Sequence, residues 1–314
     1  MHDRTDGPTA LFVLGQSLVV RSYRSFFALL TQPSRVRVAL AAPRRFRELG
    51  GQLVECEPFD RPFDSAGGDY PGFVLKSCNL HVQIVLFAGL FGALRRFFRP
   101  HGGKGPDGGQ RQIFLCMAEP YSVTAFAAWL TARAALGANF VFICYTAQNI
   151  FKELAFPLRF IQKFIFRRSA AIVVVGREQE SVLRRHGYRG ICLDFPLWFD
   201  SLRFHPQART QDKLVIGYGG TLSLEKGILD LLLGCEVQAR RWGQSCRLMI
   251  AGAGPLAGQI RERCQRLAQL GWTVNFAGPL PAAQMPRLFF RDRHFGRAEQ
   301  DDTALEGAVR PRDH

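Results

Sequence analysis

The residues with the clearest chemical potential lie in the segment Ile216–Cys235, which reads IGYGGTLSLEKGILDLLLGC. An expected strand enters a turn that contains Gly217, Gly219 and Gly220, and Lys226 stands where the next helix should begin. Glycines let a backbone approach a ligand closely, and free N–H groups at a helix N-terminus attract anions. A lysine there adds a point charge for phosphate. The segment therefore predicts a phosphate-binding turn.

An ordinary strand–turn–helix with a surface lysine has the same pattern, and it remains the alternative. The segment is not a P-loop, because the sequence lacks GxxxxGK[ST].

A second glycine-containing turn follows the expected strand of LMIAGAGPL, residues 248–256, and it includes Gly252, Gly254 and Pro255. Ligands of open α/β sheets bind at the carboxyl ends of strands, so we interpret this turn as nucleotide-proximal. With the following alanine it also matches the loose GxGxxA dinucleotide pattern. However, the next expected strand, Thr273–Ala277, ends without the acidic residue that a ribose needs. Tight-turn glycines without a ligand are the alternative.

The elements that must position these turns follow a strand–helix alternation. In the first half we predict strands at residues 10–20 (broken by a glycine), 36–41, 112–117, 139–145 and 170–175, and helices at 21–30, 80–98, 123–135, 158–168 and 179–186. In the second half we predict strands at residues 214–218, 247–251 and 273–277, and helices at 227–238 and 259–270. This alternation predicts an α/β fold class with two Rossmann-like, doubly wound domains, the second one incomplete.

The predicted organisation has four parts. An N-terminal Rossmann-like domain covers residues 1–190, a linker covers 191–212, and a partial C-terminal Rossmann-like domain covers 213–290. Residues 291–314 carry dense charge without an apolar period, so we expect a disordered tail.

The charge of the chain is strongly positive. Lys plus Arg number 41 and Asp plus Glu number 26, which gives a net charge of +15. Such a field attracts polyanions such as nucleic acids, anionic headgroups and nucleotide diphosphates, although a gene rich in arginine codons is the alternative. The arginines are scattered, and the sequence has neither an RNA-binding aromatic signature nor tandem zinc spacing. We therefore expect no nucleic-acid partner.

The eight cysteines contain no CxxC pair and no metal-ligand spacing, so we expect free thiols and no metal site. The N-terminus does not resemble a signal peptide. The longest apolar run, Val82–Leu94, is shorter than the roughly 20 residues that span a bilayer. We therefore expect a cytoplasmic protein. The basic amphipathic stretch Arg159–Arg168 predicts peripheral contact with the inner face of the membrane, and a helix packed on the sheet is the alternative.

Several segments together resemble glycosyltransferase family 4, whose fold is GT-B. In the second half these are GG-T-LSLEKG, AGAGP and VNFAGPL. In the first half they are AEPYS at 118–122, TAQNIFKELAFPLRFIQKFIFRRSA at 146–170 and VVVGREQESVLRRHGY at 173–188. FPLWFDSLRFHP at 195–206 resembles the family's linker, with Trp198 in place of a glycine. The resemblance spans most of residues 10–290.

The resemblance implies that a sugar is transferred, with retention of configuration, from a nucleotide-sugar donor to a glycan or lipid-linked acceptor. It implies no separate cofactor. Thr221 stands where the family has an arginine, so one phosphate contact differs. The implied donor-diphosphate residues are Gly15, Gly219, Gly220, Thr221 and Lys226. The implied acceptor-cleft residues, near expected strand ends, are Arg21, Tyr23, His81, Glu119 and Tyr121. For His81, a structural histidine beside an apolar helix is the alternative.

The family also uses a Glu-x7-Glu motif beyond the last matched strand, and the pattern fails just after residues 285–290. One back-translation of Ala298–Asp313, read one base later, gives Pro-Ser-Arg-Thr-Thr-Pro-Arg-Trp-Lys-Glu-Gln-Phe-Gly-Arg-Val. That peptide resembles the family's continuation, including the first glutamate of the motif. We therefore expect that the tail is an out-of-frame translation and that this chain, lacking the motif, has negligible turnover.

Two other classes of protein stay open. One is a non-catalytic nucleotide-binding or membrane-surface interaction remnant, which the missing acidic motif favours. The other is an NAD-dependent oxidoreductase, which the missing ribose carboxylate disfavours.

Overall fold

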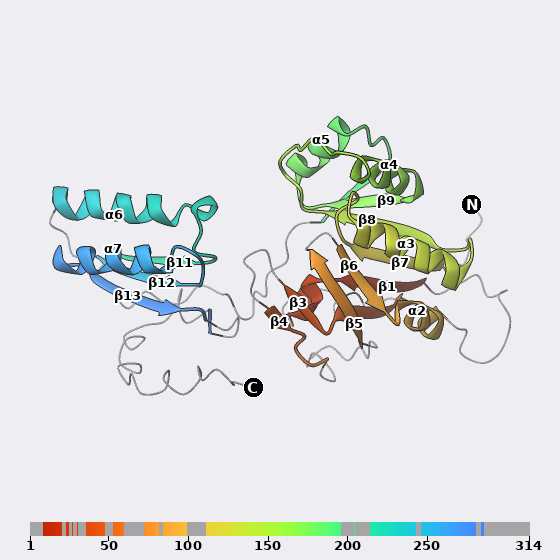
Figure 1. Cartoon of the computed structure of the whole chain (residues 1–314), viewed down its shortest axis with the longest axis horizontal. Coiled ribbons are helices and arrows are strands. Elements are labelled where there is room, and N and C mark those ends of the chain that lie inside the picture. Colours follow the sequence, from red (N-terminus) through yellow and green to blue (C-terminus); the bar gives the residue numbers. More distant parts are fainter. Residues whose placement is uncertain are drawn as a thin grey trace, which may run out of the picture. The chain divides into compact units, whose positions relative to one another are not determined.

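The computed structural model describes residues 9–20, 23–24, 27, 30, 36–47, 53–59, 72–81, 84–98, 111–195, 204, 214–242, 246–280 and 284–285. The chain divides into two compact units, Met1–Asp200 and Ser201–His314. Each unit has its own sheet (Figure 1) and its own hydrophobic core.

The first unit contains an eight-stranded sheet with the order β10-β9-β8-β7-β1-β2-β5-β6. Every neighbouring pair is parallel except β5 and β6, which form an antiparallel hairpin at one edge. The carboxyl ends of the parallel strands therefore meet at one edge of the sheet. The strands are β1 (Thr9–Gly15), β2 (Val36–Pro43), β5 (Gly72–His81), β6 (Ile84–Ala88), β7 (Arg111–Met117), β8 (Val141–Thr146), β9 (Ala171–Val174) and β10 (Ile191–Asp194).

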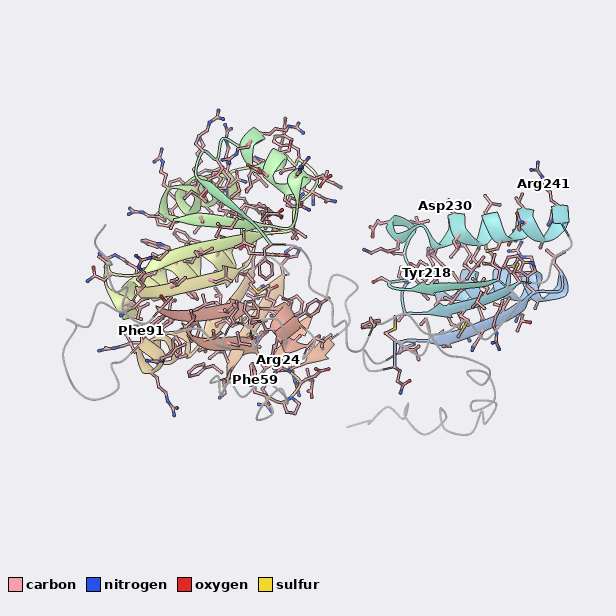
Figure 2. All side chains as sticks on the ribbon, turned by 180° about the vertical axis from the view of Figure 1, so that it is seen from behind. Arg24, Phe59, Phe91, Tyr218, Asp230 and Arg241 are labelled. Atoms are coloured by element: carbon pink, nitrogen blue, oxygen red, sulfur yellow. The ribbon has the colours of Figure 1, made fainter. Side chains whose placement is uncertain are left out.

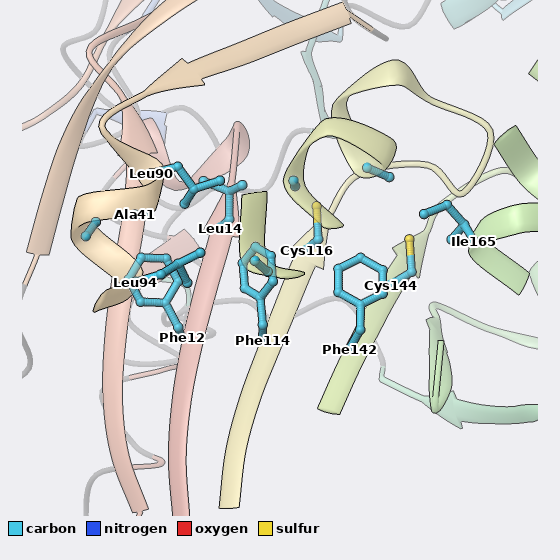
Figure 3. Packing of buried hydrophobic residues seen from close by; sticks show 14 of the residues in the cluster. Phe12, Leu14, Ala41, Leu90, Leu94, Phe114, Cys116, Phe142, Cys144 and Ile165 are labelled. Atoms are coloured by element: carbon cyan, nitrogen blue, oxygen red, sulfur yellow. The ribbon is translucent and has the colours of Figure 1, made fainter. Parts of the chain in front are cut away.

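Helices cover one face of this sheet over a continuous core. Phe12, Phe114 and Phe142 occupy matching positions on β1, β7 and β8, with ring centroids 5.9 and 5.7 Å apart (Figure 3). Their alignment fixes the register of the central strands, because a one-residue slip would turn each ring to the other face. The helices of this unit are α2 (Leu90–Phe98), α3 (Val123–Leu136), α4 (Leu158–Arg168) and α5 (Arg177–Arg185).

The opposite face carries a smaller core around β1 and β2. It is closed by a short helical turn, η1 (Ser17–Val19), and by a separate antiparallel hairpin of β3 (Arg45–Arg47) and β4 (Leu53–Glu55).

The second unit contains a parallel three-stranded sheet, β11 (Val215–Gly219), β12 (Arg247–Ala251) and β13 (Thr273–Gly278), in sequence order. Two helices pack on one face, α6 (Ile228–Trp242) and α7 (Ala257–Gln269). A short turn, η2 (Leu224–Lys226), lies between β11 and α6. The strand–helix alternation of this segment is the one predicted from its apolar pattern.

One predicted helix is wrong. The range 80–98 contains the end of β5, all of β6 and then a shorter helix, α2. Gly89 has φ +86°, and this left-handed backbone separates the strand from the helix. The strands β5 and β10 and the hairpin of β3 and β4 were not predicted. Because β10 pairs with β9, the sheet of the first unit continues into the range expected to be a linker.

Other predictions lie outside the described residues. Most of the helix expected at 21–30 is among them, as is the whole tail 291–314. Of the described helices, none is both long and apolar enough to cross a membrane.

Candidate functional site

The glycine-rich turn after β11 is anchored by its backbone and by one buried side chain. The N–H of Gly220 donates to the carbonyl of Ala251 at 3.1 Å, and the N–H of Leu222 donates to the carbonyl of Ala253 at 2.9 Å. Leu222 is fully buried between the two strand ends. Tyr218, on the strand that leads into the turn (Figure 2), donates its hydroxyl to the carbonyl of Thr221 at 2.9 Å. These contacts fix the shape of the turn.

Three consecutive residues of this turn, Gly219, Gly220 and Thr221, are exposed. The N–H of Thr221 has no acceptor within the described part of the chain. Lys226 is also exposed, at the end of η2, and Gly227 follows it with φ +66°. The left-handed glycine lets the chain turn directly into α6. The turn thus presents an unused N–H, and a lysine follows five residues later.

The second glycine turn packs closely against the first. A Cβ on Gly252 would lie 1.9 Å from the carbonyl oxygen of Gly220, and one on Gly254 would lie 2.4 Å from the carbonyl oxygen of Leu222. Gly252 also has φ +150°, which other residues rarely adopt. Both glycines are therefore required by packing of one turn on the other, without a ligand. Pro255 continues this turn.

Packing within the unit does not require a glycine at position 220. A Cβ there would meet nothing closer than the Tyr218 hydroxyl, at 3.6 Å, which is an ordinary contact. Its φ also lies outside the left-handed range. A larger residue would therefore fit the unit as it stands.

In the first unit, a polar cluster forms at the carboxyl ends of β7 and β8. The half-buried carboxylate of Glu119 accepts from the Thr146 hydroxyl at 2.5 Å and from the Ala147 N–H at 3.0 Å. Tyr121 donates its hydroxyl to the side-chain oxygen of Gln148 at 3.2 Å. Glu119 therefore ties the ends of two adjacent strands together.

Burial dominates the electrostatics of this cluster. It raises the pKa of Glu119, while the hydrogen bonds from Thr146 and Ala147 and the charge of Lys152 lower it. Burial, followed by the charge of Glu119, raises the pKa of Tyr121 to about 12. The Tyr121 hydroxyl therefore stays protonated at neutral pH and remains a hydrogen-bond donor, while the Glu119 carboxylate accepts hydrogen bonds.

The structure brings together only part of the predicted acceptor set. Tyr23 is exposed, and it lies near Tyr145, whose pKa is raised by burial, then by Glu119, with a smaller effect from Tyr23. The adjacent Arg24 is buried, with its guanidinium 4.3 Å from the ring centroid of Phe59 (Figure 2).

The remaining predicted positions of the first unit lie elsewhere. His81 lies at the tip of the β5–β6 hairpin, three strands along the sheet from β7, so it does not join the cluster of Glu119. Arg21 lies outside the described residues. Gly15 ends β1, where a Cβ would lie 3.0 Å from Leu18 and 3.2 Å from the sulfur of Met117. Tight packing therefore contributes to the need for glycine there.

Sequence reasoning missed Thr146 and Gln148 as members of this cluster. Both belong to the TAQN segment directly after a predicted strand, and that position was the available signal. No group of three or more potential metal ligands occurs among the residues that the structure describes.

No protein-family model matches the chain, and no curated protein matches it. Solved structures do. The chain is similar to a glycosyltransferase from Rickettsia africae ESF-5, with a TM-score of 0.55, 10% identity, and coverage of 90% of this chain and 70% of that chain. It is also similar to Alr3699/HepE from Anabaena, solved in complex with UDP and glucose, with a TM-score of 0.52, 12% identity, and coverage of 88% and 71%.

The chain has a GT-B-like fold. The two likenesses confirm the predicted fold class, an α/β protein with two Rossmann-like units. At 10–12% identity they show the fold alone, and function must be argued from the site.

Proposed function

We propose that the chain has the binding parts of a sugar transferase: a nucleotide-sugar binds in its second unit, and the acceptor of the sugar binds in its first unit. The fold supports this proposal, because it is shared with a glycosyltransferase and with Alr3699/HepE, which was solved with UDP and glucose. The observation that carries it is the glycine turn. Packing within the unit does not require a glycine at position 220, and the N–H of Thr221 has no acceptor in the described residues. A diphosphate would use both features.

The matched test compares two glycine-to-alanine variants in the second unit. Gly220→Ala places a methyl group on the proposed phosphate surface, with room for it in the fold. Gly258→Ala places one on helix α7, where nothing lies within 4 Å of it. We expect Gly220→Ala to weaken UDP or GDP binding about tenfold or more, measured by calorimetric titration, because the methyl group blocks close approach. Gly258→Ala should bind like the unmodified chain.

Equal nucleotide affinity in all three proteins would contradict the proposal. Circular dichroism of Gly220→Ala checks that a loss of affinity does not come from unfolding. NADH in the same titration tests the oxidoreductase alternative, and tighter binding of NADH than of UDP or GDP would favour it.

Lys226 is the proposed charge partner of the diphosphate. The structure leaves it exposed, and it follows the glycine turn that leads into α6. We propose that it contacts the phosphates directly, and that Thr221 supplies its N–H where the related family has an arginine side chain.

Retention of configuration and negligible turnover are finer proposals that rest on the sequence resemblance. Nucleotide binding without measurable transfer would also fit a non-catalytic remnant. Incubation with UDP- and GDP-sugars, followed by detection of the transferred sugar, tests turnover: sugar transfer by the purified chain would reject both negligible turnover and the non-catalytic remnant.

We also propose peripheral membrane contact through the helix α4 and the residues before it. Part of the apolar side of the predicted stretch Arg159–Arg168 faces the protein: Ile161 and Ile165 are buried in the core, and Phe164 packs edge-to-face against Trp129. The exposed apolar groups are Phe156, at 83%, and Phe160, at 58%.

Three cations close to these two residues in the sequence, Lys152, Arg159 and Lys163, are also exposed, as is one carboxylate, Glu153. Exposed aromatic rings together with nearby cations are typical of a segment that binds an anionic membrane surface. We expect Phe156→Ser together with Phe160→Ser to reduce co-sedimentation with phosphatidylglycerol vesicles about tenfold. The control pair is Leu130→Ser with Ile191→Ser, which removes exposed apolar groups elsewhere. An equal loss in both pairs would contradict a specific contact.

A further inference from the structure

A pocket of about 330 Å³ opens to solvent at the carboxyl end of β2 in the first unit. Its lining residues come from two segments: Arg44, at the bend between β2 and β3, with Arg45, which begins β3, and then Lys76 and Ser77 on β5. None of these residues belongs to the site proposed above. Three of the four lining side chains are cationic, and none is acidic.

The backbone that presents these cations is held on both sides. The N–H of Arg44 donates to the carbonyl of Leu75 at 2.8 Å, and its carbonyl accepts from the N–H of Cys56 at 2.9 Å. The carbonyl of Arg45 accepts from the Ser77 hydroxyl at 3.2 Å and from the Asn79 amide at 2.8 Å. The bend is therefore fixed to β5 and to the chain after β4, and the cations project from a preorganised frame.

The charge of the pocket is not balanced within the described part of the chain. Arg45 forms an ion pair with Glu55 at 2.8 Å. The side chains of Arg44 and Lys76 have no hydrogen-bond or ion-pair partner among the described residues. Three cations and one carboxylate leave about two positive charges in one solvent-open hollow, an arrangement whose mutual repulsion a bound anion would relieve.

We propose that this pocket binds a phosphate group. A phosphate monoester carries a charge of about −1.5 to −2 at neutral pH, which matches the surplus better than the single charge of a carboxylate. Arg44 supplies a planar fork of N–H donors, and Lys76 supplies a compact ammonium. The Ser77 hydroxyl is committed to the Arg45 carbonyl, so it positions the frame.

The pocket lies at the same edge of the sheet as Glu119, because β2, β1 and β7 are parallel neighbours. If the donor diphosphate occupies the second unit, the phosphate bound here belongs to the acceptor. This assignment to the acceptor rests on the proposed function, whereas phosphate binding itself does not. The inference thus narrows the acceptor to a phosphorylated glycan or a phospholipid-linked molecule.

The test uses the full chain and glycerol 3-phosphate, whose binding is followed by ³¹P NMR line broadening. We expect Arg44→Gln combined with Lys76→Gln to weaken binding about tenfold or more. The control, Arg177→Gln with Arg189→Gln, removes two exposed cations of the same unit and should leave the affinity unchanged. Glu55→Gln should strengthen binding, because it releases Arg45 from its ion pair.

Unchanged binding in the pocket variant, or an equal loss in the control, overturns the proposal. Vesicles that contain phosphatidic acid separate the two sources of phosphate. Pocket-dependent binding of vesicles supports a lipid headgroup, and pocket-dependent binding of glycerol 3-phosphate alone supports a soluble phosphorylated acceptor. Calorimetric titration with UDP tests the donor site separately, since the pocket variant should keep the nucleotide affinity of the unmodified chain.

Discussion

At the scale of single residues, Glu119 shows how one group can stabilise the fold and shape the candidate site. Its carboxylate is held by a hydroxyl from β8 and by the N–H that follows it. Burial raises its pKa, and these hydrogen bonds oppose that shift. The pKa of Glu119 therefore depends on how the strand ends around it are arranged.

We predict that Thr146→Val destabilises the first unit by about 1–3 kcal/mol near pH 7, since it removes the hydroxyl that donates to Glu119 and accepts from the N–H of Gln148. The loss should be smaller near pH 4. Without Thr146, the folded-state pKa of Glu119 rises further above its unfolded value. The stability that comes from protonation of Glu119 in the folded state is therefore complete below the unfolded pKa, and it is lost as pH rises through the folded pKa. Urea unfolding at the two pH values measures the difference.

Glu119→Gln supplies the control for this prediction. The amide does not titrate, so Thr146→Val in that background should cost the same at both pH values. If the threonine substitution alone already cost the same at pH 4 and pH 7, the carboxylate would not be the group through which it acts.

At the scale of elements, the paired glycine turns connect the sequence pattern to the shape of the candidate donor site. We predict that Gly252→Ala destabilises the second unit by about 3 kcal/mol or more, because its Cβ would overlap the Gly220 carbonyl and its φ is left-handed. Gly258→Ala, in open space on α7, should instead stabilise the unit by about 0.5–1 kcal/mol. Urea unfolding followed by circular dichroism compares the two. Tolerance of Gly252→Ala would contradict the close packing of the turns.

The elements also show what the sequence could and could not predict. Segments with a clear period were predicted well: α4 occupies the expected residues 158–168, and β12 the expected 247–251. The range 80–98 failed because Val82–Leu94 is apolar almost throughout, so its composition suits a strand or a helix equally. The break at Gly89 depends on its left-handed backbone, which composition alone does not specify.

The candidate site was predictable only in part for a related reason. The spacing of the glycines and the lysine in the first turn was evident from the sequence. The groups that pack against each glycine were not. Gly220, Gly252 and Gly254 look alike in sequence, and only the structure distinguishes the glycine that has room for a Cβ beside Tyr218 from the two that pack against backbone. The pocket of Arg44 and Lys76 was missed because it combines residues far apart in the chain.

At the scale of the whole molecule, each unit has an independent core, so we expect two calorimetric unfolding transitions. Two substitutions identify them: Thr146→Val should lower only the transition of the first unit, and Gly258→Ala should raise only that of the second. UDP at about 100 times its Kd should then stabilise the second unit by about 2.7 kcal/mol. The first unit should respond less, because the glycine turn and Lys226 lie in the second. A shift of the first transition as large as that of the second would contradict this assignment of the diphosphate.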